Sequence, residues 1–327
     1  MNRRALLIGL CAAALAPAAA LAQRSEGKRR IGYFGVQPPD SEATRRGLAL
    51  FRDVLKRHAL VEGRDYVLDY VWEERIERVP AKMRALAAGK VDLIVAITTP
   101  VALAARDATR EIPIVFGTVS DPVGSGLVAS LARPGGNITG VTNVLPELSG
   151  KLLELAREIV PGTRRIGAMW NPDNPAKALE YRALQEASAH AGIELNAFPV
   201  RTASEIERVL FDLGARKLDV LVTLAETLTN ANRKRIAELA LAARMPTVFS
   251  FTEHVRAGGL VSYSPDYSVL ARRLAEHAGR ILLGADPAAL PVEQPTHFQL
   301  AVNLATARSL GLAIPQSVLL RANVVIE

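Results

Sequence analysis

Cysteine is almost absent from this sequence: Cys11 is the only one among 327 residues. Because Cys11 lies in an N-terminal segment that we expect to be removed, the mature chain is predicted to have no disulfide, thiolate metal site or cysteine nucleophile. The five histidines form no H-x-H or H-E-x-x-H pattern, and no G-x-S-x-G pattern occurs. These absences predict a binding protein without metal or cofactor rather than an enzyme.

Charge of one sign is not concentrated anywhere. The chain has 40 Lys and Arg against 33 Asp and Glu, a formal net charge of +7. The basic residues are dispersed as on solvated helix faces, and no basic run is interleaved with aromatic residues. This pattern argues against nucleic acid as a partner. Beyond the N-terminus, no apolar run reaches the roughly 20 residues that a membrane-spanning helix needs.

The first 22 residues have the pattern of a secretory signal peptide. An arginine pair at 3–4 precedes an apolar run at 5–16, and the triplet Ala-Leu-Ala at 20–22 is a small-x-small cleavage pattern. We therefore expect export to the periplasm, cleavage after Ala22 and a mature chain that begins at Gln23. A retained anchor is the alternative, but the apolar run is too short to span a membrane.

The export route stays open at the level of sequence. Arg3 and Arg4 weakly resemble the start of a twin-arginine signal, whereas the general secretory route needs only the apolar run and the cleavage pattern. Lipidation of Cys11 is disfavoured, because Leu10 before it is larger than the small residue that a lipidation motif requires.

Short apolar runs alternate with amphipathic stretches along the whole chain. We predict strands at 29–36, 66–72, 91–98, 112–119, 137–143, 164–171, 194–200, 220–226 and 247–251. We predict helices at 41–58, 77–88, 100–109, 122–132, 147–159, 175–191, 203–215 and 230–243. This alternation predicts an α/β protein with parallel sheets covered on both faces. Since RRIGYFG and RRIGAMW each open such a series, we expect two similar doubly wound lobes.

Three strands are followed by a capping residue and a proline: Thr99-Pro100, Asp121-Pro122 and Asn174-Pro175. These pairs are good helix starts, and capping alone explains each of them. Ligands of open α/β sheets, however, bind beyond the carboxyl ends of the strands. Helix starts that meet there favour an anionic group, and the lack of Arg or Lys in the first two loops suits a single carboxylate better than a phosphate.

A glycine-rich loop, DPVGSGLVASLARPGGN, follows the strand predicted at 112–119. Residues 124–129 match G-x-G-x-x-A, but in a dinucleotide-binding site this motif follows the first strand. A phosphate-binding loop is also excluded, because no Gly-Lys-Ser/Thr follows. We therefore expect Gly124 and Gly126 to permit close packing of the helix predicted at 122–132 on the sheet. The segment 134–137 is predicted to be a turn.

Long motifs in order make this chain resemble a known family. The runs DPVGSGLVASLARPGGNITGVTN, WNPDNPAKALE, GGLVSYSPDY and LPVEQPTHFQLAVNLATARSLGLAIPQSVLLRANVVIE resemble the ABC-transporter substrate-binding family of tryptophan/tyrosine-type uptake receptors. The resemblance spans about residues 28–327. It implies a type I periplasmic-binding fold, in which two lobes are joined by three crossovers and a hinge closes them on the ligand.

The same resemblance implies where the lobes divide. Lobe one is expected at 29–141 plus 264–290, and lobe two at 142–263 plus 291–327. The crossovers would be NITGVTN, GLVSYSP and LPVEQPTHF.

Strand ends in this fold give the candidate ligand-binding residues. They are Thr98, Thr99, Ser120, Asp121, Asn143, Asn171, Glu226, Ser262 and Tyr263. Three of them supply hydroxyls for a carboxylate, namely Thr98, Thr99 and Ser120. An ammonium group could be held by Asp121 or Glu226.

Three further residues could either bind the ligand or play a structural role. Asp266 could hold an ammonium group or, as the resemblance implies, play a structural part near the hinge. Trp170 and Phe251, like Tyr263, could stack on an apolar ligand or pack in the core, and core packing is favoured for Phe251.

We therefore expect a monomeric solute receptor that delivers a small molecule to an ABC-type membrane permease with its ATPase. The expected ligand is a carboxylate compound, an amino acid with an apolar or aromatic side chain. A ligand sensor for a membrane receptor, or a periplasmic enzyme, is the alternative on the same fold.

Overall fold

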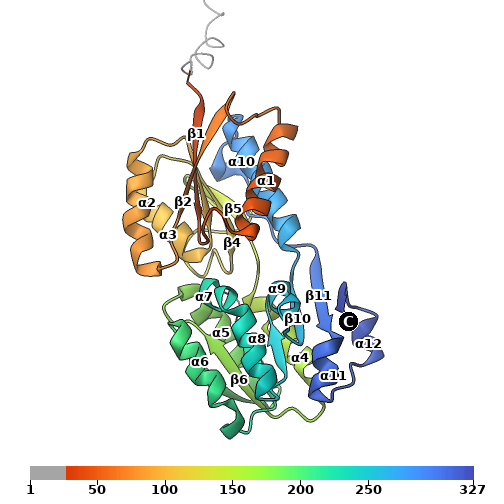
Figure 1. Ribbon diagram of the computed structural model, residues 1–327. Helices are drawn as coiled ribbons and strands as arrows, with labels where there is room; N and C mark the ends of the chain where they lie inside the picture. Colours follow the sequence, from red (N-terminus) through yellow and green to blue (C-terminus); the bar gives the residue numbers. More distant parts are fainter. Residues whose placement is uncertain (1–26, 225) are drawn as a thin grey trace, which may run out of the picture.

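The computed structural model describes residues 27–224 and 226–327. The predicted signal peptide and its cleavage site lie outside these residues. Within them, no helix has both the length and the apolar character needed to cross a membrane. The chain forms two α/β lobes, one above the other in Figure 1.

Lobe one is built on a five-stranded parallel sheet in the order β2-β1-β3-β4-β5. Its strands are β1 Arg29–Gly35, β2 Tyr66–Trp72, β3 Leu93–Ile97, β4 Ile114–Val119 and β5 Ile138–Thr142. The covering helices are α1 Glu42–Arg57, α2 Val79–Ala88, α3 Thr99–Ala108 and α10 Tyr267–Leu282. Short 3-10 turns occur at η1 Ile76–Arg78 and η4 Pro287–Ala289.

The central strand β3 shows why this sheet is covered on both faces. Ile94 and Ala96 pack into the core beneath α2 and α3, whereas Leu93 and Val95 pack into the core beneath α1 and α10. All four side chains are fully buried. A strand buried on both faces reads as a continuous apolar run, which is the pattern of a parallel sheet between two helix layers.

Lobe two is built on a seven-stranded sheet in the order β12-β11-β10-β9-β8-β6-β7. Its strands are β6 Arg165–Trp170, β7 Glu194–Pro199, β8 Val220–Thr223, β9 Thr247–Phe249, β10 Val261–Pro265, β11 Phe298–Asn303 and β12 Val324–Ile326. The pairing is parallel except between β10 and β11, which are antiparallel. The predicted fold class, two doubly wound α/β lobes of the type I periplasmic-binding kind, is confirmed.

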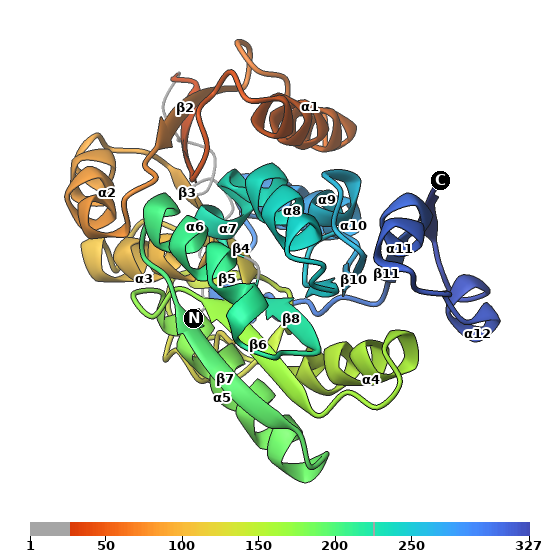
Figure 2. The same cartoon turned by 60° about the horizontal axis from the view of Figure 1, so that its bottom comes forward.

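The helices of lobe two flank this sheet. They are α4 Ser149–Ile159, α5 Pro175–His190, α6 Ala203–Phe211, α7 Thr227–Ala231, α8 Arg233–Ala242, α9 Thr252–Arg256, α11 Leu304–Leu310 and α12 Gln316–Leu319, with 3-10 turns at η2 Pro146–Leu148 and η3 Leu213–Ala215. β11, α11 and α12 form the C-terminal edge of the lobe, at the right of Figure 2.

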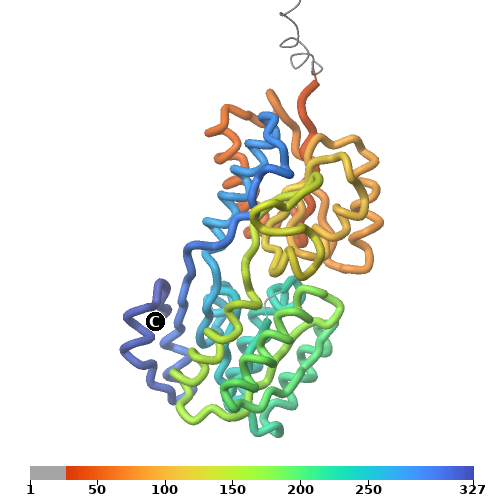
Figure 3. Tube along the Cα trace, turned by 180° about the vertical axis from the view of Figure 1, so that it is seen from behind, coloured from red at the N-terminus to blue at the C-terminus, as the bar shows by residue number. Residues whose placement is uncertain are grey.

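The chain passes between the lobes after β5, between β10 and α10, and between η4 and β11 (Figure 3). Two of these passages are hydrogen bonded to each other. The Thr142 N–H donates to the Glu293 carbonyl at 3.0 Å, and the Glu293 N–H donates to the Gly140 carbonyl at 3.0 Å. Side-by-side connections of this kind let two lobes rotate about a shared hinge.

The helix predicted at 122–132 is wrong, because this segment consists of turns and bends. The Asp121 carboxylate accepts the Gly124 N–H at 2.7 Å, a bond that also occurs at helix starts, but here only turns follow it. A Cβ on Gly124 would lie 2.0 Å from the Asp121 carboxylate, and Gly126 has φ +68°. The two glycines therefore serve this turn and not close packing of a helix on the sheet.

Candidate ligand-binding site

A cavity of about 320 Å³ lies between the lobes. Its volume is in the range of small-molecule pockets. Five of the predicted site residues line it: Thr98, Thr99, Ser120, Asn143 and Glu226. Other lining residues that matter below are Tyr33, Tyr70, Lys177, Asn230, Phe251, Glu253 and Tyr267.

The lobe-one wall presents hydroxyls and the start of α3. The helix begins at Thr99, so the capping position belongs to Thr98 rather than to Thr99 as predicted. Thr98 makes no side-chain capping bond and has φ +84°, a strained backbone for a threonine. Since Pro100 follows, the N–H groups of Thr99 and Val101 are the donors of the first turn, and such donors favour an anionic group.

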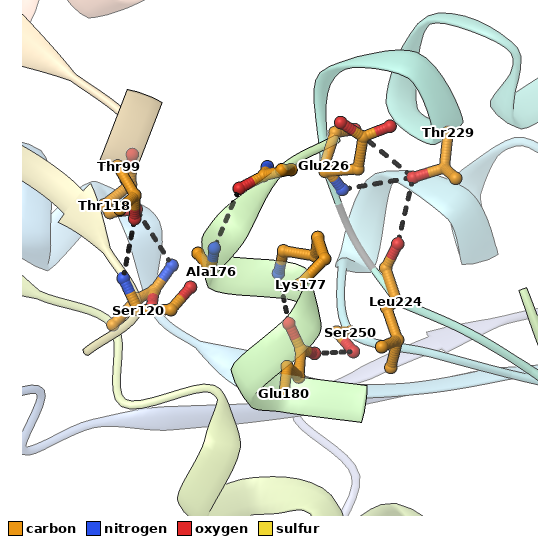
Figure 4. A network of polar contacts seen from close by, with 12 residues as sticks. Thr99, Thr118, Ser120, Ala176, Lys177, Glu180, Leu224, Glu226, Thr229 and Ser250 are labelled. Atoms are coloured by element: carbon orange, nitrogen blue, oxygen red, sulfur yellow. Dashed lines mark hydrogen bonds and ion pairs between the residues drawn. The ribbon is translucent and has the colours of Figure 1, made fainter. Parts of the chain in front are cut away.

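Thr99 has a hydroxyl proton to offer. Its Oγ1 accepts the Ser120 N–H at 3.4 Å, and the side chain is buried at the cavity wall (Figure 4). A hydroxyl that accepts one hydrogen bond still has its own O–H to donate. Thr99 and Ser120, from two neighbouring strand ends, therefore form a neutral donor pair that suits a carboxylate.

Two pairs of stacked aromatic rings give the cavity its apolar part. Tyr33 and Tyr70 of lobe one stack with ring centres 5.8 Å apart, and Phe251 and Tyr267 stack at 4.4 Å and 14°. The Tyr70 hydroxyl lies so close to Gly35 that a Cβ there would be 2.2 Å from it. Gly35 is therefore the residue that lets Tyr70 reach the cavity.

The lobe-two wall carries a buried ion pair. Lys177 and Glu180 lie one turn apart at the start of α5, and their side chains are 3% and 0% exposed. Their helix starts as predicted: Asn174 caps it by accepting the Ala176 N–H at 3.1 Å, and Pro175 follows. Figure 4 shows Lys177 and Glu180 facing each other, with Ser250 beside Glu180.

Glu226 lies at the start of α7 and is 7% exposed. Its carboxylate accepts the Leu228 N–H at 3.0 Å, and its own N–H donates to the Thr229 hydroxyl at 3.1 Å. Burial raises the pKa of the Glu226 carboxyl above its usual range, although the nearby charge of Lys177 opposes this shift. Glu226 is thus a buried carboxyl that resists ionisation.

Asn143 adds an acceptor to the same region. Its amide N–H donates to the Thr118 carbonyl at 3.3 Å, while its buried Oδ1 has no hydrogen-bond partner within the described residues. Buried polar atoms are normally paired, so an unpaired oxygen on a cavity wall indicates an incoming donor.

Four predicted site residues lie outside the cavity lining. The Asp121 carboxylate accepts the Gly124 N–H in the turn described above, and Ser262 is fully buried in β10. Tyr263 stacks on Phe298 at 5.7 Å instead of facing the ligand space. Asn171 is buried and acts on the cavity only through Glu226, whose ionised form its side chain favours.

The structure also shows the surroundings of the three residues that could either bind the ligand or play a structural role. Asp266 caps α10 by accepting the Ser268 N–H at 2.9 Å and accepts the Gln299 amide at 2.8 Å, which ties α10 to β11 near the hinge. Trp170 stacks on Tyr181 at 4.6 Å and packs against the core of lobe two. Phe251, for which core packing is favoured by sequence, lines the cavity.

Sequence reasoning missed Lys177, Tyr33, Tyr70 and Tyr267 as lining residues. For Lys177 a signal was present, since it follows Asn174-Pro175 within the first turn of a helix that starts at a strand end. Within residues 27–224 and 226–327, no group of three His, Cys, Asp or Glu is close enough to hold a metal ion.

The model of the family described as "ABC transporter substrate binding protein" matches residues 39–326. A "Tyrosine-binding protein" of Clostridioides difficile (strain R20291) is 30% identical over 223 residues, which cover 68% of this chain and 64% of that relative. This chain therefore matches somewhat less than two thirds of that relative's length.

Two solved structures are similar over nearly the whole chain. A conserved domain protein from Vibrio cholerae has 30% identity and a TM-score of 0.83, with coverage of 91% of this chain and 99% of that one. An ABC domain in complex with L-Trp from Streptococcus pneumonia has 26% identity and a TM-score of 0.81, with coverage of 92% and 100%.

Proposed function

Because the chain belongs to the ABC transporter substrate-binding protein family, we propose that it captures an amino acid with an apolar or aromatic side chain and delivers it to an ABC-type permease. The supporting observation is the composition of the cavity between the lobes. Neutral donors lie on the lobe-one wall, the buried carboxyl of Glu226 lies on the lobe-two wall, and aromatic pairs lie beside them.

These three features match the three parts of such a ligand. The carboxylate would meet Thr99, Ser120 and the first N–H groups of α3. The ammonium group would meet Glu226 and Asn143 Oδ1. An aromatic side chain would stack beside Phe251 and Tyr267, where ring-on-ring contact adds to the gain from burial.

The relatives agree with this chemistry. One is called a tyrosine-binding protein, and a structure with 26% identity holds L-Trp. We extend both to this chain as candidate ligands, L-tyrosine and L-tryptophan. Delivery to a permease, a monomeric state and export to the periplasm with cleavage after Ala22 belong to the same proposal.

Thermal unfolding with a panel of small molecules tests the ligand class. The panel contains amino acids, aromatic acids without an amine, sugars, nucleosides and polyamines. A true ligand at 100 times its Kd stabilises the protein by about 2.7 kcal/mol. For a chain of this size that raises Tm by about 4 °C. Shifts from sugars or polyamines alone would refute the amino-acid assignment.

Delivery and location need separate measurements. Cells lacking this chain should take up labelled L-tyrosine or L-tryptophan more slowly, and intact mass of the exported protein should begin at Gln23. Scattering should show a smaller radius of gyration with ligand than without, because the ligand bridges two lobes joined by a hinge. Normal uptake in the deletion strain, with ligand binding intact, would favour a sensor.

A further inference from the structure

At and just behind the lobe-two wall of the cavity lie three buried charged side chains, Lys177, Glu180 and Glu226, whose charges do not balance. Lys177 and Glu226 line the cavity, and Glu180 lies behind the wall, paired with Lys177. Arg46 of α1 also lines the cavity, but its side chain is exposed. All three side chains are at least nine-tenths buried. If both carboxylates are ionised, the cluster carries a net charge of −1 in a region that water barely reaches, which is unfavourable without a partner.

The elements packed around Glu226 supply no second buried cation. From α5 it faces Lys177, which already pairs with Glu180, and from the β6 end it faces the neutral Asn171. Arg233 of α8 donates to the Asn230 carbonyl at 2.8 Å, and Glu253 of α9 is exposed and acidic. The neighbouring His254 is fully buried, and burial lowers its pKa to about 3, so it is neutral at ordinary pH.

We propose that the Lys177–Glu180–Glu226 cluster is a cation subsite that the ligand's ammonium group completes, and that capture of the ligand expels a proton which Glu226 holds in the empty protein. The proposal rests on the amino-acid function proposed above. It makes ligand capture a proton-releasing event and therefore dependent on pH.

The charges balance in both states. In the empty protein Glu226 is a neutral acid, so Lys177 and Glu180 cancel and the buried cluster is neutral. The ligand enters with its ammonium group already charged, the O–H bond of Glu226 breaks, and the proton passes to the solvent buffer. Glu226 and the ammonium group then form a second ion pair, and the buried region is neutral again.

A simpler explanation is that Glu226 is only the cap of α7. Its contacts with Leu228 and Thr229 do form a capping box. A carboxylate near a helix start is stabilised by the free N–H groups there, however, and does not need to be buried. Glu205 on α6 of the same lobe is an example. Glu205 accepts the Arg201 N–H at 2.6 Å beside the cap Thr202, yet it does not line the cavity. Glu205 is therefore the matched control.

Titration calorimetry with L-tyrosine or L-tryptophan, in buffers of different ionisation enthalpy, counts the protons released. Because the pKa of Glu226 lies above its ordinary 4.5, more than about half a proton per ligand should be released at pH 4.5, and fewer as the pH rises. Below that pKa the Kd should rise up to tenfold for each unit of falling pH. Circular dichroism at each pH verifies that the protein is folded.

Two comparisons test whether the released proton comes from Glu226 and whether the ligand's ammonium group causes its release. Glu226→Gln should abolish proton release and flatten the pH profile, whereas Glu205→Gln should leave both as in the native protein. The amine-free analogue 3-(4-hydroxyphenyl)propionate should bind the native protein without releasing a proton.

The outcomes are distinguishable. Binding of L-tyrosine with no proton release at any pH from 4.5 to 8 overturns this inference and leaves the proposed function standing. Equal proton release by Glu226→Gln also overturns it. If neither amino acid binds at all, the proposed function fails and this inference fails with it.

Discussion

The Lys177 ammonium and the Glu180 carboxylate form an ion pair inside lobe two, with side chains 3% and 0% exposed. The two residues are one helical turn apart on α5, and Ser250 donates to the same carboxylate at 3.5 Å. A fully buried pair behaves unlike a surface pair, because each charge depends on the other for compensation.

Lys177→Met should destabilise the protein by about 3 to 5 kcal/mol, since it leaves Glu180 buried without a partner. Urea unfolding of the empty protein measures the change. The double variant Lys177→Met with Glu180→Met should recover most of the loss, because two apolar side chains replace the pair.

The matched control is Lys151→Met, which removes a surface pair with Glu154 at the same spacing. Its effect should stay within about 0.5 kcal/mol. Equal losses at the two lysines would show that the Lys177 pair is not electrostatically isolated from water.

Thr99→Ala should weaken binding of L-tyrosine or L-tryptophan about tenfold, because the ligand carboxylate loses one hydroxyl donor. That factor equals about 1.4 kcal/mol, the scale of one hydrogen bond to a charged group. Thr99→Ser keeps the hydroxyl and should bind within about threefold of the native protein. An unchanged Kd for the alanine variant would place the carboxylate elsewhere.

Phe251→Ala should lower affinity for L-tyrosine more than affinity for L-leucine. The ring stacks on Tyr267 at 4.4 Å on the cavity wall, and such aromatic contacts contribute about 0.5 to 1.5 kcal/mol beyond buried area. The preference for the aromatic ligand should fall about three- to tenfold, as measured by calorimetry. Phe211→Ala, on a ring 67% exposed on α6, is the control.

Glu226→Gln should stabilise the empty protein at pH 8 and have little effect at pH 4. Burial raises the pKa of this carboxyl, so the native state keeps a proton that the unfolded chain loses. The native protein therefore loses stability as pH rises above about 4.5, up to the raised pKa, and the glutamine variant does not. Thermal unfolding from pH 4 to 8 without ligand measures the growing difference.

Apolar periodicity predicted most of the fold, because a strand that is buried on both sheet faces, such as β3, has a continuous apolar sequence. It failed at 122–132, where apolar residues recur at helical spacing but Asp121 and Gly124 form a turn instead. The strands β10, β11 and β12 and the helix α10 were not predicted either. β11 pairs antiparallel with β10 at the end of the chain, outside the βα alternation that marks the other strands.

Only some of the residues that line the cavity could be predicted from the sequence. Strand-end position predicted Thr99, Ser120 and Glu226 as lining residues, because the fold fixes where strands end. Tyr33 and Tyr70 come from within strands, so no end position marks them, and their reach depends on the missing side chain of Gly35. Which of these residues touch the ligand stays a prediction.

The order of the chain has a consequence for synthesis. Lobe one needs α10 at 267–282 to cover one face of its sheet, and lobe two needs β11 and β12 at 298–326 to finish its own. A chain that leaves the ribosome N-terminus first can therefore complete neither lobe until α10 has emerged, since each core needs partners that are distant in sequence. Truncation before Tyr267 would leave one face of the lobe-one sheet uncovered and the lobe-two sheet without β11 and β12.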